Sequence, residues 1–348
     1  MKISNFNLNQ IDNFLNFNRN IYPLRKNLEK RFQYQIIDNP FLEDKNNPYG
    51  FVSYTEDDKI IGQFFLNPFK FHFSGRDCKG FLASDYYVSE NYRGECGAIL
   101  ALKAIRSFKP YFAIGVTEIA KKIHLSLGTK ILGSLNKFIW LSNIFSPIII
   151  IKYLLFKNKR IIKPNKTIQF PQNIITRGVE FKLINYLDSW TDYHWDDSLE
   201  FSRSLDFLSW RFFGSLKGYY FYLSQKTNNP FYFVVRKSIW KGLLLLLIVD
   251  YKIPYNDINA WQAVLKSSKL LAKMNSCDGV LTFSSHRFFD NGLKKSLFLK
   301  IGNPNLILTN FETSFSTKDI NKRNSVFATM ADSDTDFNFD ESYSPFGL

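Results

Sequence analysis

The sequence predicts an α/β protein built from two successive domains, each a mostly antiparallel, twisted sheet flanked by helices. Three observations support this. The chain of 348 residues can form two cores at about 100 to 200 residues per domain. Short apolar runs typical of strands precede amphipathic helical patterns, and this order occurs twice. We expect a domain over 1–135, a connecting segment over 136–177, a second domain over 178–330 and an acidic tail over 331–348.

The first domain is expected to begin with a polar helix over Asn9–Arg31, whose apolar stripe includes Ile11 and Phe14. Charged and glycine-containing turns then separate short apolar runs, which is typical of β-hairpins. The expected strands are Gly50–Tyr54 with Ile60–Leu66, Phe69–Phe73 with Phe81–Val88, and Tyr111–Gly115. This order predicts an antiparallel meander followed by a helix and one further strand.

The most informative stretch follows the strand that ends at Val88. Residues 89–92 are expected to form a turn. Arg93–Ala98, which contains two glycines, follows this turn and leads into an amphipathic helix. Glycines let the backbone approach an anion, and the unpaired amides and positive dipole end of the new helix then face it. The order of strand, basic glycine turn and helix predicts a phosphate-binding site.

At these residues the chain resembles the GNAT acyltransferase superfamily, whose pyrophosphate signature reads Arg/Gln-x-x-Gly-x-Gly/Ala. Arg93–Ala98 fits this signature, with Cys96 in place of its first glycine. A second family pattern, Asn-x-x-Ala-x-x-x-Tyr-x-Lys-x-Gly-Phe, is matched more loosely downstream. Ala120 and Gly128 keep their spacing. The other family positions carry Thr117, His124, Ser126 and Thr129.

The resemblance implies acetyl-CoA, or another acyl-CoA, as co-substrate. The cofactor-binding residues would be Tyr87 and Val88, whose backbone pairs with the pantetheine arm, and Arg93, Gly94, Glu95, Cys96, Gly97 and Ala98, whose amides hold the pyrophosphate. An acceptor amine or hydroxyl would attack the thioester directly, so the enzyme needs a base and an acid.

The resemblance also suggests which residues exchange protons. The family's acid is usually a helical Tyr, and His124 occupies that position. An unperturbed pKa of about 6.5 suits proton exchange near neutrality. Asp85, Tyr87 and Glu118 are candidates for the base or for orienting the substrate, and no spacing singles one out.

Each of these residues also has a structural interpretation. Arg93–Ala98 could begin a helix without holding a ligand, and His124 could be a packed side chain. Asp85 and Glu118 could be solvated or paired. Cys96 fits better as a small residue replacing glycine than as a nucleophile.

A nearly continuous apolar run, Phe138–Phe156, is closed by the basic cluster Lys157–Arg160. A membrane-spanning helix needs about 20 apolar residues, and Pro147 and Lys152 interrupt this run. Two alternatives stay open. The run could be a buried helix between domains, or 138–166 could contact the anionic inner leaflet of the plasma membrane.

The second domain repeats the pattern of strands and helices. Its Leu208-Ser209-Trp210-Arg211 segment resembles the C-terminal half of tandem-GNAT proteins found with bacterial surface-polysaccharide genes. The expected elements are helices over Asp206–Phe213, Asn256–Met274 and His286–Gly292, and strands over Tyr219–Ser224, Phe231–Arg236, Gly242–Asp250 and Gly279–Phe283. Residues 251–255 contain no glycine, so this half is expected to shape the acceptor site rather than hold CoA.

The net charge of +14 favours an acidic partner such as a nucleotide cofactor, a nucleotide-sugar, an anionic lipid or a nucleic acid. No DNA-binding module is recognisable, so we expect no DNA partner. Three scattered cysteines and the lack of a signal peptide predict a cytoplasmic protein, with peripheral attachment at the inner membrane face as an open alternative.

We also expect no metal. Four dispersed histidines do not form a zinc ligand set. The tail Asp332–Asp336 fails the EF-hand pattern, because Phe337 and Tyr343 occupy the positions of the required Gly and Glu. A solvated acidic loop is expected there, with contact to a sugar or amine in a cleft as the alternative.

Three functions fit these observations. The first is an acyl-CoA-dependent N- or O-acyltransferase acting on a sugar or lipid-linked glycan precursor in bacterial cell-envelope polysaccharide biosynthesis. The second is a Fem-like transferase that moves an aminoacyl group from tRNA onto a cell-wall precursor, which would suit the basic charge. The third is a non-catalytic, degenerate GNAT scaffold at the membrane.

Overall fold

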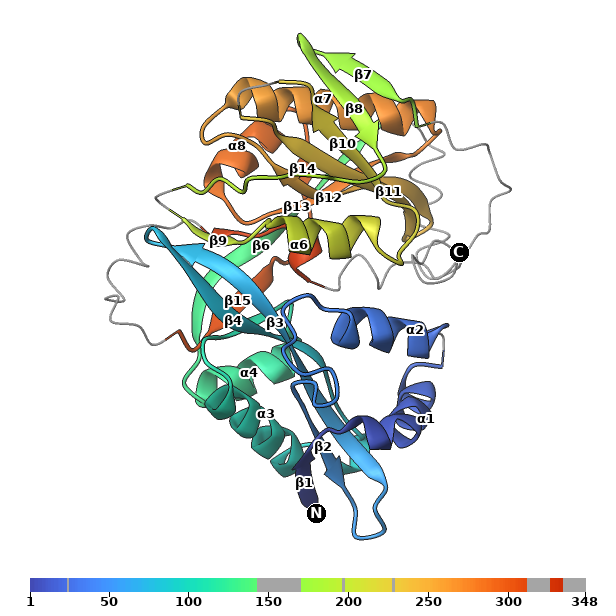
Figure 1. Ribbon diagram of the computed structural model, residues 1–348, viewed down its shortest axis with the longest axis vertical. Coiled ribbons are helices and arrows are strands. Elements are labelled where there is room, and N and C mark those ends of the chain that lie inside the picture. The colour runs from blue at the N-terminus through green and yellow to red at the C-terminus, as the bar shows by residue number, and fades with distance from the viewer. Residues whose placement is uncertain (24, 143–169, 196–197, 227–228, 312–325, 334–348) are drawn as a thin grey trace. The chain divides into compact units, whose positions relative to one another are not determined.

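The computed structural model describes residues 1–23, 25–142, 170–195, 198–226, 229–311 and 326–333 (Figure 1). Contacts group the chain into two compact units. The first comprises Met1–Ser134, Asp196–Ser202 and Asn305–Val326, and the second comprises Leu135–Trp195, Arg203–Pro304 and Phe327–Leu348. Each unit therefore gathers segments that are distant in sequence, whereas the domains expected from the sequence were contiguous. Each unit is described by itself below.

The first unit contains one mixed sheet with strand order β1-β2-β3-β4-β5-β15, and β9 pairs with β3. The strands are β1 (Lys2–Asn5), β2 (Gly50–Tyr54), β3 (Ile60–Phe73), β4 (Arg76–Val88), β5 (Tyr111–Ile114), β9 (Leu199–Phe201) and β15 (Asn305–Thr309). The pairing of β4 with β5 is parallel, and the other pairings are antiparallel. The predicted fold class is confirmed for this unit.

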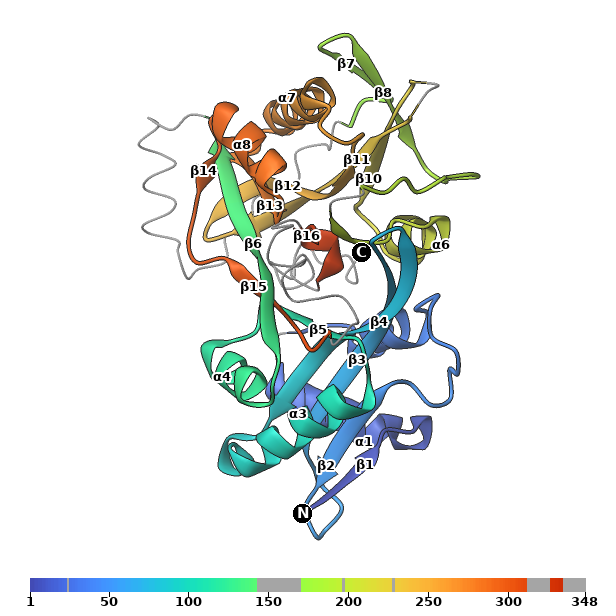
Figure 2. The ribbon, with the colours of Figure 1, turned by 90° about the vertical axis from the view of Figure 1, so that its left-hand side faces the viewer.

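Helices cover both faces of this sheet. They are α1 (Ile11–Ile21), α2 (Leu28–Phe32), α3 (Glu95–Ser107) and α4 (Glu118–Ser126). Successive residues of a strand point to opposite faces. Phe64 of β3 packs in the core with α3, while Phe65 packs in the core with α1 and α2. Helix α3 therefore packs on one face of the sheet at β3, and α1 and α2 pack on the other face (Figure 2).

Two expected elements of this unit differ in extent. The helix predicted over Asn9–Arg31 ends at Ile21, because the residue before a proline is disfavoured in the helical conformation and Pro23 has no amide proton. The two strands predicted around Pro68 form the single strand β3, which pairs with β4 along its length.

The second unit has the strand order β6-β13-β12-β11-β10-β8-β7, and β14 pairs with β6. The strands are β6 (Lys130–Leu141), which enters from the first unit, β7 (Asn173–Thr176), β8 (Val179–Ile184), β10 (Tyr220–Ser224), β11 (Tyr232–Trp240), β12 (Leu243–Lys252), β13 (Gly279–Ser284) and β14 (Leu299–Lys300). Only β12 and β13 pair in parallel among these described neighbours.

The helices in the described part of the second unit are α6 (Leu205–Leu208), which continues as one π-helical turn over Ser209–Phe213, α7 (Ile258–Met274) and α8 (Arg287–Lys295). Trp261 and Val264 of α7 pack in one core with Leu246 and Ile248 of β12. The sheet of this unit is also mostly antiparallel and flanked by helices, as predicted.

The expectation of a solvated acidic loop is wrong for Asp332. The chain forms β16 (Val326–Phe327) and a 3-10 turn over Met330–Asp332. The Asp332 carboxylate is buried and accepts hydrogen bonds of 2.8 and 2.6 Å from the guanidinium of Arg203. The same guanidinium donates to both carboxylate oxygens of Asp250, at 3.1 and 3.0 Å from Nε. Asp332 is therefore one of two carboxylates that pair with the same buried guanidinium, and this pairing compensates for the loss of water around it.

Other expectations fall outside the described residues. Asp334 and Asp336 lie there, as does most of the apolar and basic segment 138–166. Among the helices of the described ranges, none has the length and apolar character needed to span a membrane.

Candidate functional site

The glycine turn predicted to hold phosphate connects β4 to α3. After Val88 the chain makes a 3-10 turn over Glu90–Tyr92, and α3 begins at Glu95. Gly94 precedes the helix with φ +97 and ψ −106, a conformation that a side chain would strain. A Cβ at Gly94 would contact no atom within 4 Å. The turn therefore requires glycine for its backbone conformation, and the space beside it is open.

The amides at the start of α3 are available to a ligand. Within the described part of the chain, no protein oxygen accepts a hydrogen bond from the amides of Gly94, Glu95, Cys96 or Gly97. The first amide that enters the helical pattern is that of Ala98, which donates to the Gly94 carbonyl at 2.9 Å. Unpaired amides and the helix dipole together favour an anion at this position.

The strand that leads into this turn separates from its parallel neighbour. β4 pairs with β5 at Phe81 with Tyr111 and at Leu82 with Phe112. In the described residues this ladder has no further pair, although β4 continues to Val88. The edge of β4 from Ala83 onward therefore offers backbone groups to an extended ligand that would reach the start of α3.

Asp85 lies at an irregularity in β4. The register with β3 shifts between the pairs Gln63 with Tyr87 and Phe65 with Ser84, and Asp85 has φ +42. Its carboxylate forms an ion pair of 3.2 Å with Arg25, and both side chains are about one-fifth exposed. The bulge therefore holds an acid beside a cation on the strand that carries the expected pantetheine site.

Tyr87 and Arg93 contact each other beside the turn. The Arg93 guanidinium lies 5.8 Å from the centroid of the Tyr87 ring. It also donates to the Val88 carbonyl at 3.3 Å and pairs with Glu90 at 3.3 Å. These contacts fold Arg93 back onto the end of β4, so its side chain helps to fix the shape of the turn.

Tyr86 lies beside the candidate site, and the sequence did not predict its contacts. Its phenol donates a hydrogen bond of 2.8 Å to the Gly97 carbonyl in the first turn of α3. Its ring stacks on Phe64 at a centroid distance of 4.5 Å. Burial raises the pKa of Tyr86 to about 12, which keeps the phenol a donor near neutral pH. The alternation of β4 places Tyr86 on the same face as Val88, and this was the available signal.

His124, the expected acid, is fully buried with both ring nitrogens hydrogen-bonded. Nδ1 lies 2.7 Å from the Ala120 carbonyl, which can only accept, so Nδ1 carries the proton. Nε2 therefore accepts from the Tyr111 hydroxyl at 2.6 Å. Burial lowers the pKa of His124, and the Ala120 carbonyl opposes this effect. To exchange a proton with a substrate, His124 would have to break one of these bonds, and its catalytic role stays a prediction.

The orientation of His124 has a local cause. Ala120, His124 and Leu127 follow a helical spacing of four and three residues, which places them on one face of α4. Leu127 packs against the core that contains α3. Thr117 begins the helix by accepting a hydrogen bond of 3.3 Å from the Ala120 amide.

Two further candidates lie in different surroundings. Glu118, in the first turn of α4, is largely exposed and pairs with Lys121 at 3.4 Å. Cys96 is buried, and its thiol donates to the Ser53 hydroxyl at 3.2 Å. Its side chain thus packs in the core, while its amide belongs to the open start of α3. No contact in the described residues brings Glu118 to Asp85 or Tyr87.

The corresponding helix of the second unit begins differently. Asp257 precedes α7, and its carboxylate accepts from the Ala260 amide at 2.9 Å. This carboxylate places a negative charge where an anion would bind. The observation agrees with the missing glycine turn in 251–255, and it favours the first unit as the place for a phosphate.

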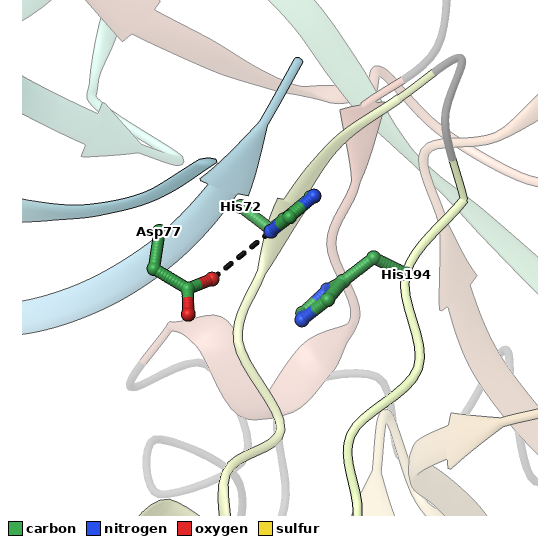
Figure 3. Close-up of side chains that lie close together, drawn as sticks. All are labelled: His72, Asp77 and His194. Carbon is green, nitrogen blue, oxygen red and sulfur yellow. Dashed lines mark hydrogen bonds and ion pairs between the residues drawn. The ribbon is translucent and has the colours of Figure 1, made fainter. Parts of the chain in front are cut away.

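A second titratable pair of the first unit lies away from this turn. His72 of β3 and Asp77 of β4 are cross-strand partners beside the hairpin turn, joined by Nδ1 and Oδ1 at 2.9 Å (Figure 3). Asp77 is separated from Val88 by the length of β4, so this pair is not part of the candidate cofactor site.

No protein-family model and no curated protein matches this sequence. Solved structures do match. A GCN5-related N-acetyltransferase from Anabaena variabilis ATCC 29413 superposes with a TM-score of 0.56 at 13% identity, over 88% of this chain and 72% of that one. A probable N-acyltransferase from Enterococcus faecalis V583 gives 0.55 at 10% identity, over 89% and 72%.

Saccharomyces cerevisiae N-myristoyltransferase with bound myristoyl-CoA gives a TM-score of 0.53 at 11% identity, over 90% of this chain and 79% of that one. At such identities the likeness shows the fold alone. Each of the three superpositions covers at least 88% of this chain. The chain therefore has the GNAT fold.

Proposed function

We propose that this chain is an acyl-CoA-dependent acyltransferase with its cofactor in the first unit. The acceptor amine or hydroxyl attacks the thioester carbonyl, a new amide or ester bond forms, and the carbon–sulfur bond breaks. The acceptor proton goes to a base, and the CoA thiolate takes up a proton as it leaves. The structural neighbours support acyl transfer as the general reaction.

The observation that carries the proposal is the open start of α3. The amides of Gly94, Glu95, Cys96 and Gly97 have no protein acceptor in the described residues. A diphosphate carries the charge and the acceptor oxygens that such amides bind. The edge of β4 near Tyr87 and Val88 would pair with the pantetheine arm, because β5 no longer covers it there.

We propose roles for the candidate catalytic residues from their surroundings. Asp85 lies on β4 close to the expected pantetheine site, held by Arg25 at the bulge, so we assign it to orienting the acceptor. His124 could serve as the acid for the thiolate only after its bond to Tyr111 opens. Tyr87 and Glu118 keep their status as further candidates.

The acceptor is proposed as a sugar or a lipid-linked glycan precursor of the bacterial envelope, with the reaction in the cytoplasm. This part rests on the resemblance of Leu208–Arg211 to tandem-GNAT proteins found with surface-polysaccharide genes. Within that segment, Arg211 is buried and donates from Nη1 to the Tyr219 hydroxyl at 2.9 Å, so its role in this chain is structural.

Calorimetric titration with acetyl-CoA tests the cofactor site. Gly94→Asp places a carboxylate at the open amides, and it should abolish binding that the unaltered chain shows. Gly75→Asp is the matched control, because Gly75 also has positive φ (+75) and open space at its Cβ, but it lies in the β3–β4 turn. Equal binding by both variants, or no binding by the unaltered chain, would refute the proposal.

A second candidate, a protein that binds acyl-CoA without turnover, is favoured by the two hydrogen bonds that hold His124 in the core. Release of free CoA thiol in the presence of a panel of amino sugars and glycan precursors distinguishes the two. Acetyl-CoA binding without thiol release across the panel would support the binding protein.

A further inference from the structure

The second unit carries a basic surface hollow that the proposed acyl transfer does not use. It has a volume of about 280 Å³, and its lining residues come from the β7–β8 turn, from α7 and from the end of α8 with the two residues that follow it. Its lining comprises Arg177, Gln262, Leu265, Lys266, Lys269, Lys295, Ser296 and Leu297. We call this set the basic hollow. Four of its residues are cationic and none is acidic.

The basic hollow is held in place by buried contacts. Thr176, next to Arg177, hydrogen-bonds to the Ala263 carbonyl at 3.1 Å and to the Ser267 hydroxyl at 2.7 Å. These bonds fix the β7–β8 turn against α7. Lys269 donates to the Ser296 carbonyl, which joins α7 to the end of α8. The positions of the cations thus follow from the fold rather than from flexible loops.

The positive charge of the basic hollow is not balanced locally. In the described residues no carboxylate forms an ion pair with Arg177, Lys266, Lys269 or Lys295. The whole of α7 contains no Asp or Glu, and Lys273 follows Lys269 by one turn. Burial lowers the pKa of Lys269, and the nearby charge of Lys273 lowers it further. Such crowding of like charges is relieved when an anionic partner is present.

Large aliphatic side chains project beside these cations. Leu297 in the lining is 76% exposed and has φ +62, an unfavourable conformation for leucine. Leu270, four residues after Lys266 on α7, is 41% exposed. Neither side chain gains much from packing within the unit. Aliphatic groups beside unbalanced lysines are typical of surfaces that enter the headgroup region of a membrane.

We propose that the basic hollow docks this protein on an anionic lipid bilayer, with lipid phosphates against Lys266 and Lys295 and with Leu297 in the interface. A small soluble phosphate would not use the exposed leucines. Proteins that bind single-stranded RNA combine a basic groove with aromatic side chains on which the bases stack, and no aromatic residue lines the basic hollow. The bilayer is therefore the partner that accounts for both the charge and the aliphatic groups.

Co-sedimentation of the full chain with phosphatidylcholine vesicles, with and without phosphatidylglycerol, tests this proposal. The unaltered chain should bind only the anionic vesicles, and more weakly at higher ionic strength. The double variant Lys266→Glu and Lys295→Glu should weaken binding at least about tenfold, since each cation near the membrane contributes substantially. Leu297→Asn should weaken binding about threefold or more, and asparagine tolerates its backbone conformation.

The matched control is the double variant Lys182→Glu and Lys217→Glu. It makes the same charge change at two exposed lysines of this unit that lie outside the basic hollow. It should change binding by no more than about twofold. The proposal is overturned if the intact chain ignores anionic vesicles, or if both double variants weaken binding equally. It is also overturned if the Lys266 and Lys295 variant binds vesicles as the intact chain does, which would assign membrane contact to another part such as 138–166.

Discussion

The phenol oxygen of Tyr86 donates a hydrogen bond of 2.8 Å to the carbonyl oxygen of Gly97. This bond joins the end of β4 to the first turn of α3, the two elements that would hold the pantetheine arm and the diphosphate. A Cβ at Gly97 would lie 2.9 Å from the same phenol oxygen, so only glycine allows this approach without a shift. The contact therefore positions the open amides relative to the strand edge.

Removing this hydrogen bond should weaken cofactor binding more than it weakens the fold. Tyr86→Phe should lower the free energy of unfolding by about 1 kcal/mol and raise the Kd for acetyl-CoA about fivefold, as measured by urea unfolding and calorimetry. Tyr222→Phe is the control, because Tyr222 also donates to a backbone carbonyl, that of Pro171 at 3.0 Å, in the second unit. A Kd that changes equally in both variants would mean that Tyr86 has no positioning role.

The buried, neutral state of His124 predicts a pH-dependent stability. Because its pKa in the folded protein lies below the ordinary 6.5, the unfolded chain binds the proton first as the pH falls. The contribution of neutral His124 to the free energy of unfolding is therefore complete above about pH 6.5. It decreases below that pH, by up to about 1.4 kcal/mol per pH unit. Urea unfolding at a series of pH values should show that decrease. His124→Gln should make the free energy of unfolding depend less on pH.

The slope comparison isolates His124, since the other histidines are the same in both proteins. An identical slope in the variant would show that His124 titrates alike in the folded and unfolded chains, contrary to the burial described above. Loss of thiol release in His124→Gln with acetyl-CoA binding retained would support a catalytic role.

The three thiols should differ in reactivity. Cys96 and Cys277 are buried, and burial raises the pKa of Cys277 to about 12. Cys78 is partly exposed. Iodoacetamide should therefore modify Cys78 first in the folded protein, and Cys96 and Cys277 only after unfolding. Peptide mass spectrometry gives the order, and rapid modification of Cys96 would show that its thiol is accessible to ligands.

Charge substitutions in the buried cluster of Arg203, Asp250 and Asp332 should lower the stability more than substitutions in exposed ion pairs. Asp332→Asn removes a charged acceptor from the Arg203 guanidinium, which stays paired with Asp250, and should cost about 1.5 to 3 kcal/mol of unfolding free energy. Glu29→Gln removes the exposed pair with Arg19 and should cost less than about 1 kcal/mol. Urea unfolding of both variants measures this difference. Equal effects would contradict the burial of Asp332.

Much of the fold could be predicted because strand periodicity and turn residues are local signals. β2, β5, β10, α7 and β13 lie close to their expected bounds. The partition of the chain could not be predicted in the same way. β15 joins β5 of the first unit through pairs such as Leu308 with Ala113, and a pairing between such distant segments leaves no local pattern in the sequence.

The candidate site was partly predictable for a similar reason. The glycine turn is a local motif, and the structure leaves its amides open. Side-chain direction depends on partners from other elements. His124 faces Tyr111 of β5, and Asp332 faces Arg203 from a distant segment. The local sequence suggested a reactive group at His124 and a solvated acid at Asp332. In the structure each side chain is buried and hydrogen-bonded to a partner from another element.

Amide chemical shifts of Gly94 and Gly97 give the most direct test of the central claim that the start of α3 binds a diphosphate. In a chain labelled with ¹⁵N-glycine, added acetyl-CoA should move both amide proton signals downfield, because each amide gains a charged acceptor. The Gly75 signal should stay unchanged. Saturable binding of acetyl-CoA that leaves the Gly94 and Gly97 signals in place would contradict the claim.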